Sequence, residues 1–342
     1  MEYVFDGRAK KLTFILMAVG LLSIVLGFFG GDHASQRVWT SILISGFYFF
    51  GVGLTGTFFL AVQYAAESGW PTVLKRIFEG IAAYLPIGSL ALILVFLAGT
   101  FHFHHIYHWM DADLYDPASP HYDEIIAHKQ AYLNLPFWWI RTIAYLAVYI
   151  WFTMLFRKRS LMEDELTVDP KPFFIKNQTL AAVFLVFFGY TSVTASWDWI
   201  MSIDTHWFST IFGWYIFSGM WISGMVMMTL LVVYLKGKGL MDFVNDSHMH
   251  DMGKWVFAIS FLWTYLFFCQ FMLYWYSDIP EEVMYFQARI NDYTWLFWGT
   301  LLINFIFPML LLMSKDAKRN AGFLMFVGVI IFFGHWMDVF MI

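Results

Sequence analysis

Ionisable side chains are sparse in this chain, and several of them interrupt long apolar stretches. Asp198, Asp338 and Arg141 lie farthest inside apolar sequence. His335 precedes Asp338 by three residues, a spacing that puts both side chains on one face of a helix. A carboxylate beside an imidazole orients the ring and raises its basicity, so this pair has the arrangement needed to accept and pass protons. The simpler alternative is that these side chains lie among lipid head groups at helix ends.

Other polar candidates gather near the ends of the apolar stretches. One group consists of Asp204, His206 and four histidines in the pattern HxHHxxH, namely His102, His104, His105 and His108. A second group, near the opposite ends of the stretches, consists of Gln63, Glu67 and Glu79. Because charge inside hydrocarbon is costly, ionisable groups at such depths usually face a cavity or a partner. We expect the first group to lie at the same membrane surface as Arg141, Asp198 and Asp338 and to extend the polar region there. His102, His105 and His108 share one helix face if the helix that precedes them continues through His108. The second group marks a half-path for protons on the other side.

The histidine pattern also raises the alternative of a haem or structural zinc site. A bis-histidine haem needs two imidazoles from facing helices, and only His335 offers a partner from another stretch. The single cysteine, Cys269, excludes a disulfide framework, a thiolate iron–sulfur site and a CxxCH haem attachment. Rossmann, P-loop and HExxH signatures are absent from the sequence. We therefore expect no metal and no redox cofactor bound by this chain alone.

The elements that must position these residues are nine apolar stretches, each long enough to cross a hydrocarbon core of about 30 Å as a helix. The predicted spans are 12–30, 38–65, 81–99, 137–156, 180–200, 210–235, 255–276, 294–313 and 322–342. Hydrophobic residues make up 60% of the chain and charged residues 13%, far from the usage of a soluble domain. The sequence therefore predicts an all-α polytopic membrane protein, with 1–342 as one integral membrane domain and no nucleic acid partner.

Basic residues orient the predicted spans. They are concentrated before the first span and after the second, fourth, sixth and eighth spans. The opposite connections hold only Arg37, Lys129 and Arg289. By the positive-inside rule, the N-terminus is cytoplasmic and the first span is a retained helix rather than a cleaved signal peptide. We expect the protein in the bacterial cytoplasmic (inner) membrane.

The most distinctive local sequence is SWDWIMSIDTHWFSTIFG at 196–213, which ends the fifth span, turns and starts the sixth. Supporting motifs are Lys129, the segment YLN at 132–134 followed by Phe137 and Arg141, and the pattern HWxD at 335–338. On these motifs the chain resembles the NrfD/PsrC-like family of quinone-interacting membrane subunits, and most closely its ActF branch from bacterial alternative complex III. The resemblance covers essentially the whole chain.

This resemblance implies two four-helix bundles, formed here by the spans within 38–200 and within 210–342, with peripheral helices that include 12–30. Relatives have ten spans, so we expect a further span beyond the nine. The family assembly oxidises quinol and passes electrons to a c-type cytochrome or an oxidase. Its haem c and iron–sulfur clusters belong to partner subunits. The implied partners are those subunits, a homologous quinol-site membrane subunit, lipids and a terminal oxidase.

The sequence thus favours a cofactor-free membrane subunit of a respiratory quinol:electron-acceptor oxidoreductase that conducts protons or supports the quinol site. In this hypothesis Asp198, and His335 with Asp338, exchange protons, and Arg141 holds the charge of a carboxylate. By resemblance the quinol pocket belongs to the sister subunit, while quinol is also a candidate ligand of this chain. A purely structural scaffold is the main alternative, in which the 39 Phe and 17 Trp serve lipid and subunit contacts. An independent secondary transporter is a third, although the sequence has no convincing midplane charge.

Overall fold

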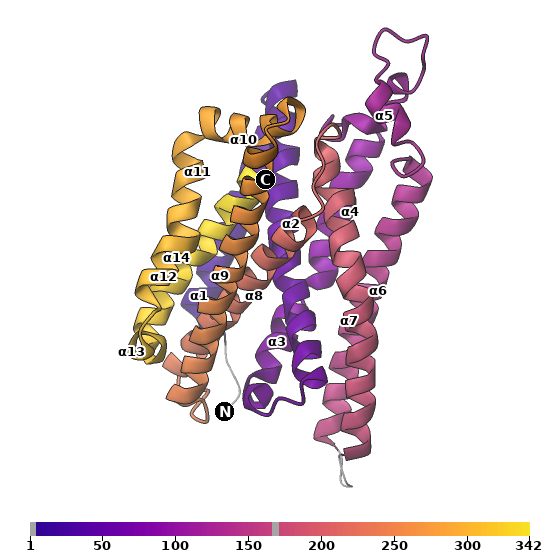
Figure 1. Cartoon of the computed structure of the whole chain (residues 1–342). Helices are drawn as coiled ribbons and strands as arrows, with labels where there is room; N and C mark the ends of the chain where they lie inside the picture. The colour runs from indigo at the N-terminus through magenta and orange to yellow at the C-terminus, as the bar shows by residue number, and fades with distance from the viewer. Residues whose placement is uncertain (1–4, 166–170) are drawn as a thin grey trace.

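The computed structural model describes residues 5–165 and 171–342, and within these ranges it contains helices and their connections but no strand (Figure 1). Nine helical spans of the described residues are long and apolar enough to cross a membrane. They are Gly7–Phe28, Asp32–Ala65, Trp70–Thr100, Leu135–Asp164, Lys171–Ile203, Phe212–Gly237, Asp246–Ser277, Thr294–Leu311 and Ala321–Met341. The predicted all-α, multi-pass character and the nine spans are confirmed.

Seven spans are formed largely by one helix each. These helices are α1 (Gly7–Phe28), α2 (Asp32–Ala65), α6 (Leu135–Asp164), α7 (Lys171–Trp199), α8 (Phe212–Gly237), α9 (Asp246–Ser277) and α14 (Ala321–Met341). Helices α6 and α7 extend well beyond the apolar sequence that predicted them. Much of the basic segment that follows the fourth predicted span is therefore helix rather than loop.

The other two spans are interrupted. One combines a 3₁₀ turn (Trp70–Leu74), α3 (Lys75–Ala82) and α4 (Leu85–Thr100); the other combines α11 (Thr294–Leu301), a π-helical segment (Leu302–Ile306) and α12 (Phe307–Leu311). Pro86 and Pro308 lie in the first turns of α4 and α12. Proline lacks the N–H that a helix interior requires, and the first turn tolerates that loss. The two breaks therefore lie directly before these prolines.

Shorter elements cap the two ends of the molecule. They are α5 (Glu124–His128), α10 (Pro280–Asp292), α13 (Lys315–Arg319) and 3₁₀ turns at His108–Met110, Ala112–Leu114 and Met201–Ile203. We call the end that carries α5 and α10 the histidine-rich end, and the end that carries α13, the C-terminus of α6 and the N-terminus of α7 the basic end (Figure 1).

Helix α2 lies at the centre of the packing, in contact with α3, α4, α7 and α8, while α8 in turn contacts α9 and α14. Glycines allow these close approaches. A Cβ atom on Gly224 of α8 would lie 2.3 Å from Cβ of Thr55, and one on Gly56 of α2 would lie 2.6 Å from the carbonyl oxygen of Phe78. The Thr55 hydroxyl lies 2.9 Å from the carbonyl oxygen of Met220, which adds a hydrogen bond between α2 and α8. Small residues and hydroxyls are what membrane helices use to approach each other.

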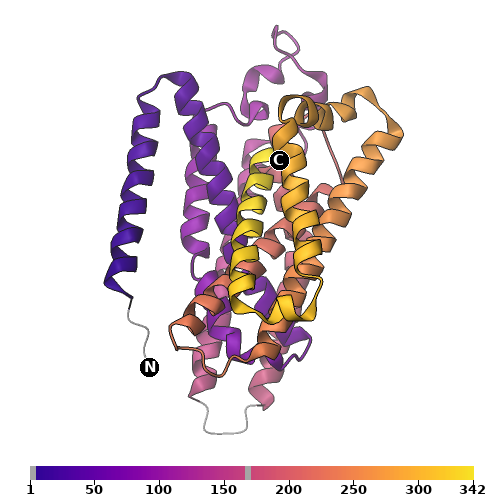
Figure 2. The same cartoon turned by 90° about the vertical axis from the view of Figure 1, so that its left-hand side faces the viewer.

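Helix α1 stands at the edge of the molecule, where it contacts α2 (Figure 2). None of its residues is buried. The division into two four-helix bundles stays a prediction, because α2 contacts helices from both halves of the chain.

The close approach of α8 to α2 leads to a first prediction. Gly224→Ala forces Thr55 to shift, and overpacking of this kind costs about 1–3 kcal/mol. We expect a lower midpoint of thermal unfolding for this variant in detergent, followed by tryptophan fluorescence. Gly189→Ala is the matched control, since a Cβ atom there meets nothing within 4 Å. Equal midpoints for both variants would contradict the packing described here.

Candidate functional site

Arg141 and Asp198 form a buried ion pair near the histidine-rich end. Asn134 caps α6 by accepting a hydrogen bond from the Phe137 N–H, and Arg141 follows in the second turn of that helix. Asp198 lies in the last turn of α7. Nε of Arg141 lies 2.8 Å from Oδ2 of Asp198, and Nη2 lies 2.7 Å from Oδ1. The two side chains are 10% and 0% exposed. This two-pronged geometry is the strong form of an arginine–carboxylate pair.

Aromatic groups enclose this pair. The guanidinium carbon of Arg141 lies 4.0 Å from the ring centre of Tyr132 and 4.1 Å from that of Phe137, within cation–π distance. The indole N–H of Trp138 donates to the backbone oxygen of Asp198 at 2.8 Å. Arg141 thus compensates the charge of Asp198 inside a closed, well-packed site.

Asp338 on α14 has a different environment. Its side chain is 4% exposed, and it accepts hydrogen bonds from the Tyr215 hydroxyl on α8 and from the Trp263 indole on α9, the latter at 2.9 Å. In the described part of the chain, no basic side chain forms an ion pair with it. An isolated charge in an apolar interior is costly, so a carboxyl group in this setting is suited to gaining and losing a proton.

His335 is equally buried but makes no hydrogen bond to Asp338. It is 1% exposed, and its ring packs edge-on against Trp263 with the ring centres 5.2 Å apart. Neither ring nitrogen has a hydrogen-bond partner among the described residues. The expected pairing of this imidazole with Asp338 is therefore wrong. Tyr215 and Trp263, from two other helices, donate to the carboxylate instead.

Two small cavities border Asp338. One has a volume of about 50 Å³, and its lining includes His335, Asp338, Tyr149, Trp199 and Met220. Since a single water needs about 10–15 Å³ by this measure, the cavity has room for a few water molecules. Asp198 does not line it, although its neighbour Trp199 does. The structure therefore keeps the two buried carboxylates in separate sites.

The second cavity lies on another side of Asp338. Its volume is about 20 Å³, and its lining includes Gln270, Arg289, Thr300 and Asp338. The amide oxygen of Gln270 and the hydroxyl of Thr300 are buried and have no protein partner among the described residues. Buried polar atoms are nearly always hydrogen-bonded, and a water in this space would serve both of them. Asp338 is thus flanked by two places suited to water.

The candidates Asp204, His206 and His105 lie on the surface of the histidine-rich end rather than beside the buried carboxylates. Nε2 of His206 lies 2.7 Å from Oδ2 of Asp123, which caps α5. Partial burial acts to raise the pKa of Asp123, but hydrogen bonds from the Ile126 N–H and from His206 outweigh it, so this pKa is lowered. Asp204 is exposed in the turn before α8.

Lys129 also belongs to this surface, where its ammonium donates to the backbone oxygen of Thr205. Burial lowers the pKa of Lys129, although the nearby carboxylate of Asp204 acts to raise it. The interaction ties the segment after α5 to the turn between α7 and α8. It explains why the motif residues around 129 and 205 lie together.

The four histidines of the HxHHxxH pattern do not share a helix face. Helix α4 ends at Thr100, and His102 has a backbone φ of +58° in the loop that follows. His104 turns inward, where Nε2 lies 2.9 Å from the Val95 oxygen, and burial lowers its pKa. The condition for a shared face of His102, His105 and His108 is therefore not met, because the helix ends before His102.

The candidates at the basic end have separate surroundings, and only Glu79 forms ion pairs. Glu79 is buried between Arg76, at 2.6 Å, and Arg157. Glu67 accepts a hydrogen bond from the Gln178 amide at 2.8 Å. Gln63 lines a cavity of about 150 Å³ that Glu79 does not reach. The three residues thus lie in one region but not around one space, and a half-path through them stays a prediction.

Sequence reasoning did not single out Tyr215, Trp263, Gln270 and Thr300. The first two are indistinguishable in sequence from the many aromatic residues of the spans, so no signal identified them as donors to Asp338. Gln270 carried a usable signal, since an amide in the middle of an apolar stretch usually has a partner inside the protein.

No family model matches this chain, and no curated protein matches it. The resemblance to quinone-interacting membrane subunits stays a prediction on the motifs quoted above.

The ion pair leads to a second prediction. Arg141→Ala leaves Asp198 buried and uncompensated, which costs about 3–5 kcal/mol, whereas Arg141→Met combined with Asp198→Leu removes both charges and restores most of that loss. Thermal unfolding in detergent measures both effects. Arg37→Ala, an exposed arginine at the same end, is the control. The pair would have no structural role if Arg141→Ala unfolded at the wild-type temperature.

Proposed function

We propose that this chain is a cofactor-free membrane subunit of a respiratory quinol:electron-acceptor oxidoreductase, and that its own contribution is proton transfer through Asp338. The motif at 196–213, together with the HWxD pattern, supports the assignment to such an assembly. The environment of Asp338 supports the proton role. This carboxyl group is buried in a membrane span, has no cation partner among the described residues and lies between two water-sized cavities.

Asp338 and Asp198 differ in what their partners allow. The guanidinium of Arg141 compensates Asp198 through two short hydrogen bonds, so protonation of Asp198 would break a strong pair. Asp338 receives only neutral donors, a hydroxyl and an indole N–H. Protonation of a carboxyl group held by neutral donors breaks no ion pair. Asp338 is therefore the main proton carrier in this proposal. Asp198 mainly stabilises the packing of the first spans, and it is the second candidate for proton exchange.

In this relay, water in the larger cavity would lie against His335 and Asp338, and water in the smaller cavity would lie against Asp338, Gln270 and Thr300. A proton passes from one water cluster to the carboxylate and from there to the other cluster. Tyr215 and Trp263 hold the carboxylate in position for both steps.

The proposal includes the wider assembly that the resemblance implies. The chain lies in the bacterial cytoplasmic membrane with its N-terminus in the cytoplasm, and its spans form two four-helix bundles. Haem c and iron–sulfur clusters are in partner subunits, and a homologous subunit holds the quinol pocket that this chain supports.

A structural scaffold is the second candidate, and one observation favours it. Helix α1 has no buried residue, and large aromatic side chains such as Trp295 and Tyr276 are 92% and 85% exposed. A surface of this kind suits lipid or neighbouring subunits. In the scaffold reading the buried acids only stabilise the fold.

Purification from the native membrane is the third prediction. An affinity-tagged chain should copurify with haem c, visible by its absorption, and with iron–sulfur clusters, visible by electron paramagnetic resonance. Recovery of a homogeneous protein without either signal, active in solute transport after reconstitution, would contradict the assignment to a redox assembly and favour a transporter.

The fourth prediction concerns Asp338 in the assembled complex. Asp338→Asn keeps the size of the side chain but cannot release a proton, so we expect at least about a tenfold loss of quinol turnover or of coupled proton release in proteoliposomes. Asp292→Asn, at the exposed end of α10, is the matched control and should behave as wild type.

Tyr215→Phe separates the relay from the scaffold role. It keeps the aromatic packing and removes one donor to Asp338, so the complex should assemble while turnover falls. Normal turnover and normal proton release in both Asp338→Asn and Tyr215→Phe would contradict the proposed proton relay through Asp338. Normal function combined with loss of assembly on deletion of the subunit would establish the scaffold.

A further inference from the structure

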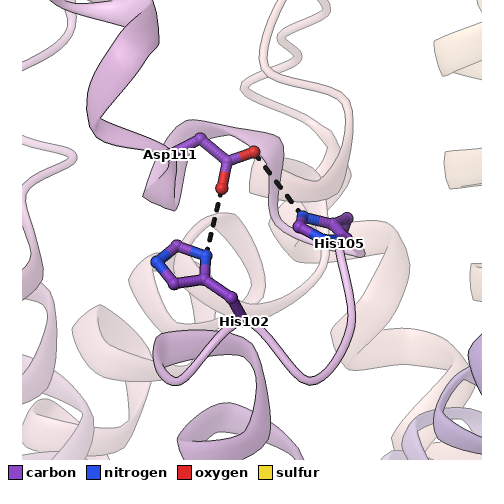
Figure 3. Close-up of side chains that lie close together, drawn as sticks. All are labelled: His102, His105 and Asp111. Carbon is purple, nitrogen blue, oxygen red and sulfur yellow. Dashed lines mark ion pairs between the residues drawn. The ribbon is translucent and has the colours of Figure 1, made fainter.

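Two histidines and one aspartate converge at the histidine-rich end, outside the site described above (Figure 3). Nδ1 of His102 lies 3.1 Å from Oδ1 of Asp111, and Nδ1 of His105 lies 3.7 Å from Oδ2. The three potential ligand atoms all lie within 4.8 Å of one another.

Contacts of the backbone, rather than of the side chains alone, bring these three residues together. His102 adopts a left-handed φ of +58°, which few non-glycine residues do, and this reverses the chain after α4. The N–H of His105 donates to the side-chain oxygen of Gln36 on α2 at 3.2 Å. His104, between the two outward histidines, is fastened inward to the Val95 oxygen. The two imidazoles are thus held on one side of the loop, facing Asp111.

We propose that His102, His105 and Asp111 bind a zinc ion. Zinc binds imidazole nitrogen at about 2.0–2.1 Å and carboxylate oxygen at about 2.0–2.2 Å in tetrahedral geometry, which puts neighbouring ligand atoms about 3.3 Å apart. The two nitrogen–oxygen separations, 3.1 and 3.7 Å, run to the two oxygens of one carboxylate and lie on either side of that value. All three ligand atoms lie within 4.8 Å of one another, so rotation of the exposed side chains completes the site. Two nitrogens and one oxygen suit zinc rather than magnesium or calcium, which prefer oxygen ligands.

The exposure of the three side chains sets the character of the site. With three protein ligands on the surface, a water molecule takes the fourth position and the ion exchanges with solvent. Because His102 and Asp111 are the two ends of the segment 102–111, the bound ion holds this segment in a fixed position against α4 and α2. The proposal departs from the sequence-based expectation that the chain binds no metal, and it does not depend on the proposed proton relay.

A surface ion pair alone explains the arrangement less well. Exposed histidine–aspartate pairs contribute little to stability, so they alone do not account for two imidazoles held against one carboxylate. Both histidines direct the same ring atom, Nδ1, at that carboxylate. Metal ligation uses this convergence.

The test uses the purified native assembly, stripped with a chelator and then loaded with zinc. Zinc retained after gel filtration is counted by mass spectrometry, and its affinity is measured against a chromophoric chelator. Wild type should retain one zinc per chain more than Asp111→Asn and His105→Ala, or bind it at least about tenfold more tightly. Asp113→Asn and His121→Ala, exposed in the chain that follows this segment, are the matched controls and should equal wild type.

Cobalt gives a second readout that does not depend on stoichiometry. Wild type loaded with Co²⁺ should show the intense visible bands of a tetrahedral site, and Asp111→Asn should lose them. Equal zinc retention, equal affinity and identical cobalt spectra in wild type and in correctly assembled Asp111→Asn would overturn the proposal.

Discussion

The structure depends on one constraint: polar groups inside a hydrocarbon core must find their partners within the protein. Each buried carboxylate of the spans meets this constraint differently. Asp198 is paired with Arg141, and Glu79 with Arg76 and Arg157. Asp338 is held by neutral donors from two other helices. The pairing decides which acid is a fixed structural charge and which is able to change its protonation state.

The same constraint connects the packing to the site. Asp338 receives its donors because α8 packs against both α14 and α9, and α8 is held against α2 through Gly224 and the Thr55 hydroxyl. A Cβ atom on Gly219 of α8 would lie 3.7 Å from Oδ2 of Asp338, so the carboxylate lies directly against the α8 backbone. The contact that assembles the two halves of the chain therefore also positions the proposed proton relay.

The proposed zinc site shows the opposite case, in which polar groups meet in water. His102, His105 and Asp111 are hydrated and have no desolvation cost to offset, so their convergence requires a different cause. The left-handed residue His102, at the end of α4, and the link from His105 to Gln36 bring them together. Of the two proposed sites, the one at the surface thus rests on backbone geometry, whereas the one in the core rests on helix packing.

The sequence by itself determined the nine spans, because length and hydrophobicity act locally along a helix. It also identified Arg141, Asp198 and Asp338 as unusual, because charge in apolar sequence is costly wherever the helices lie. Only the tertiary structure decided that Arg141 meets Asp198, that Tyr215 and Trp263 meet Asp338, and that His335 pairs with neither. Those contacts depend on how each helix is rotated about its axis, and in spans that are apolar on all sides no sequence period specifies that rotation.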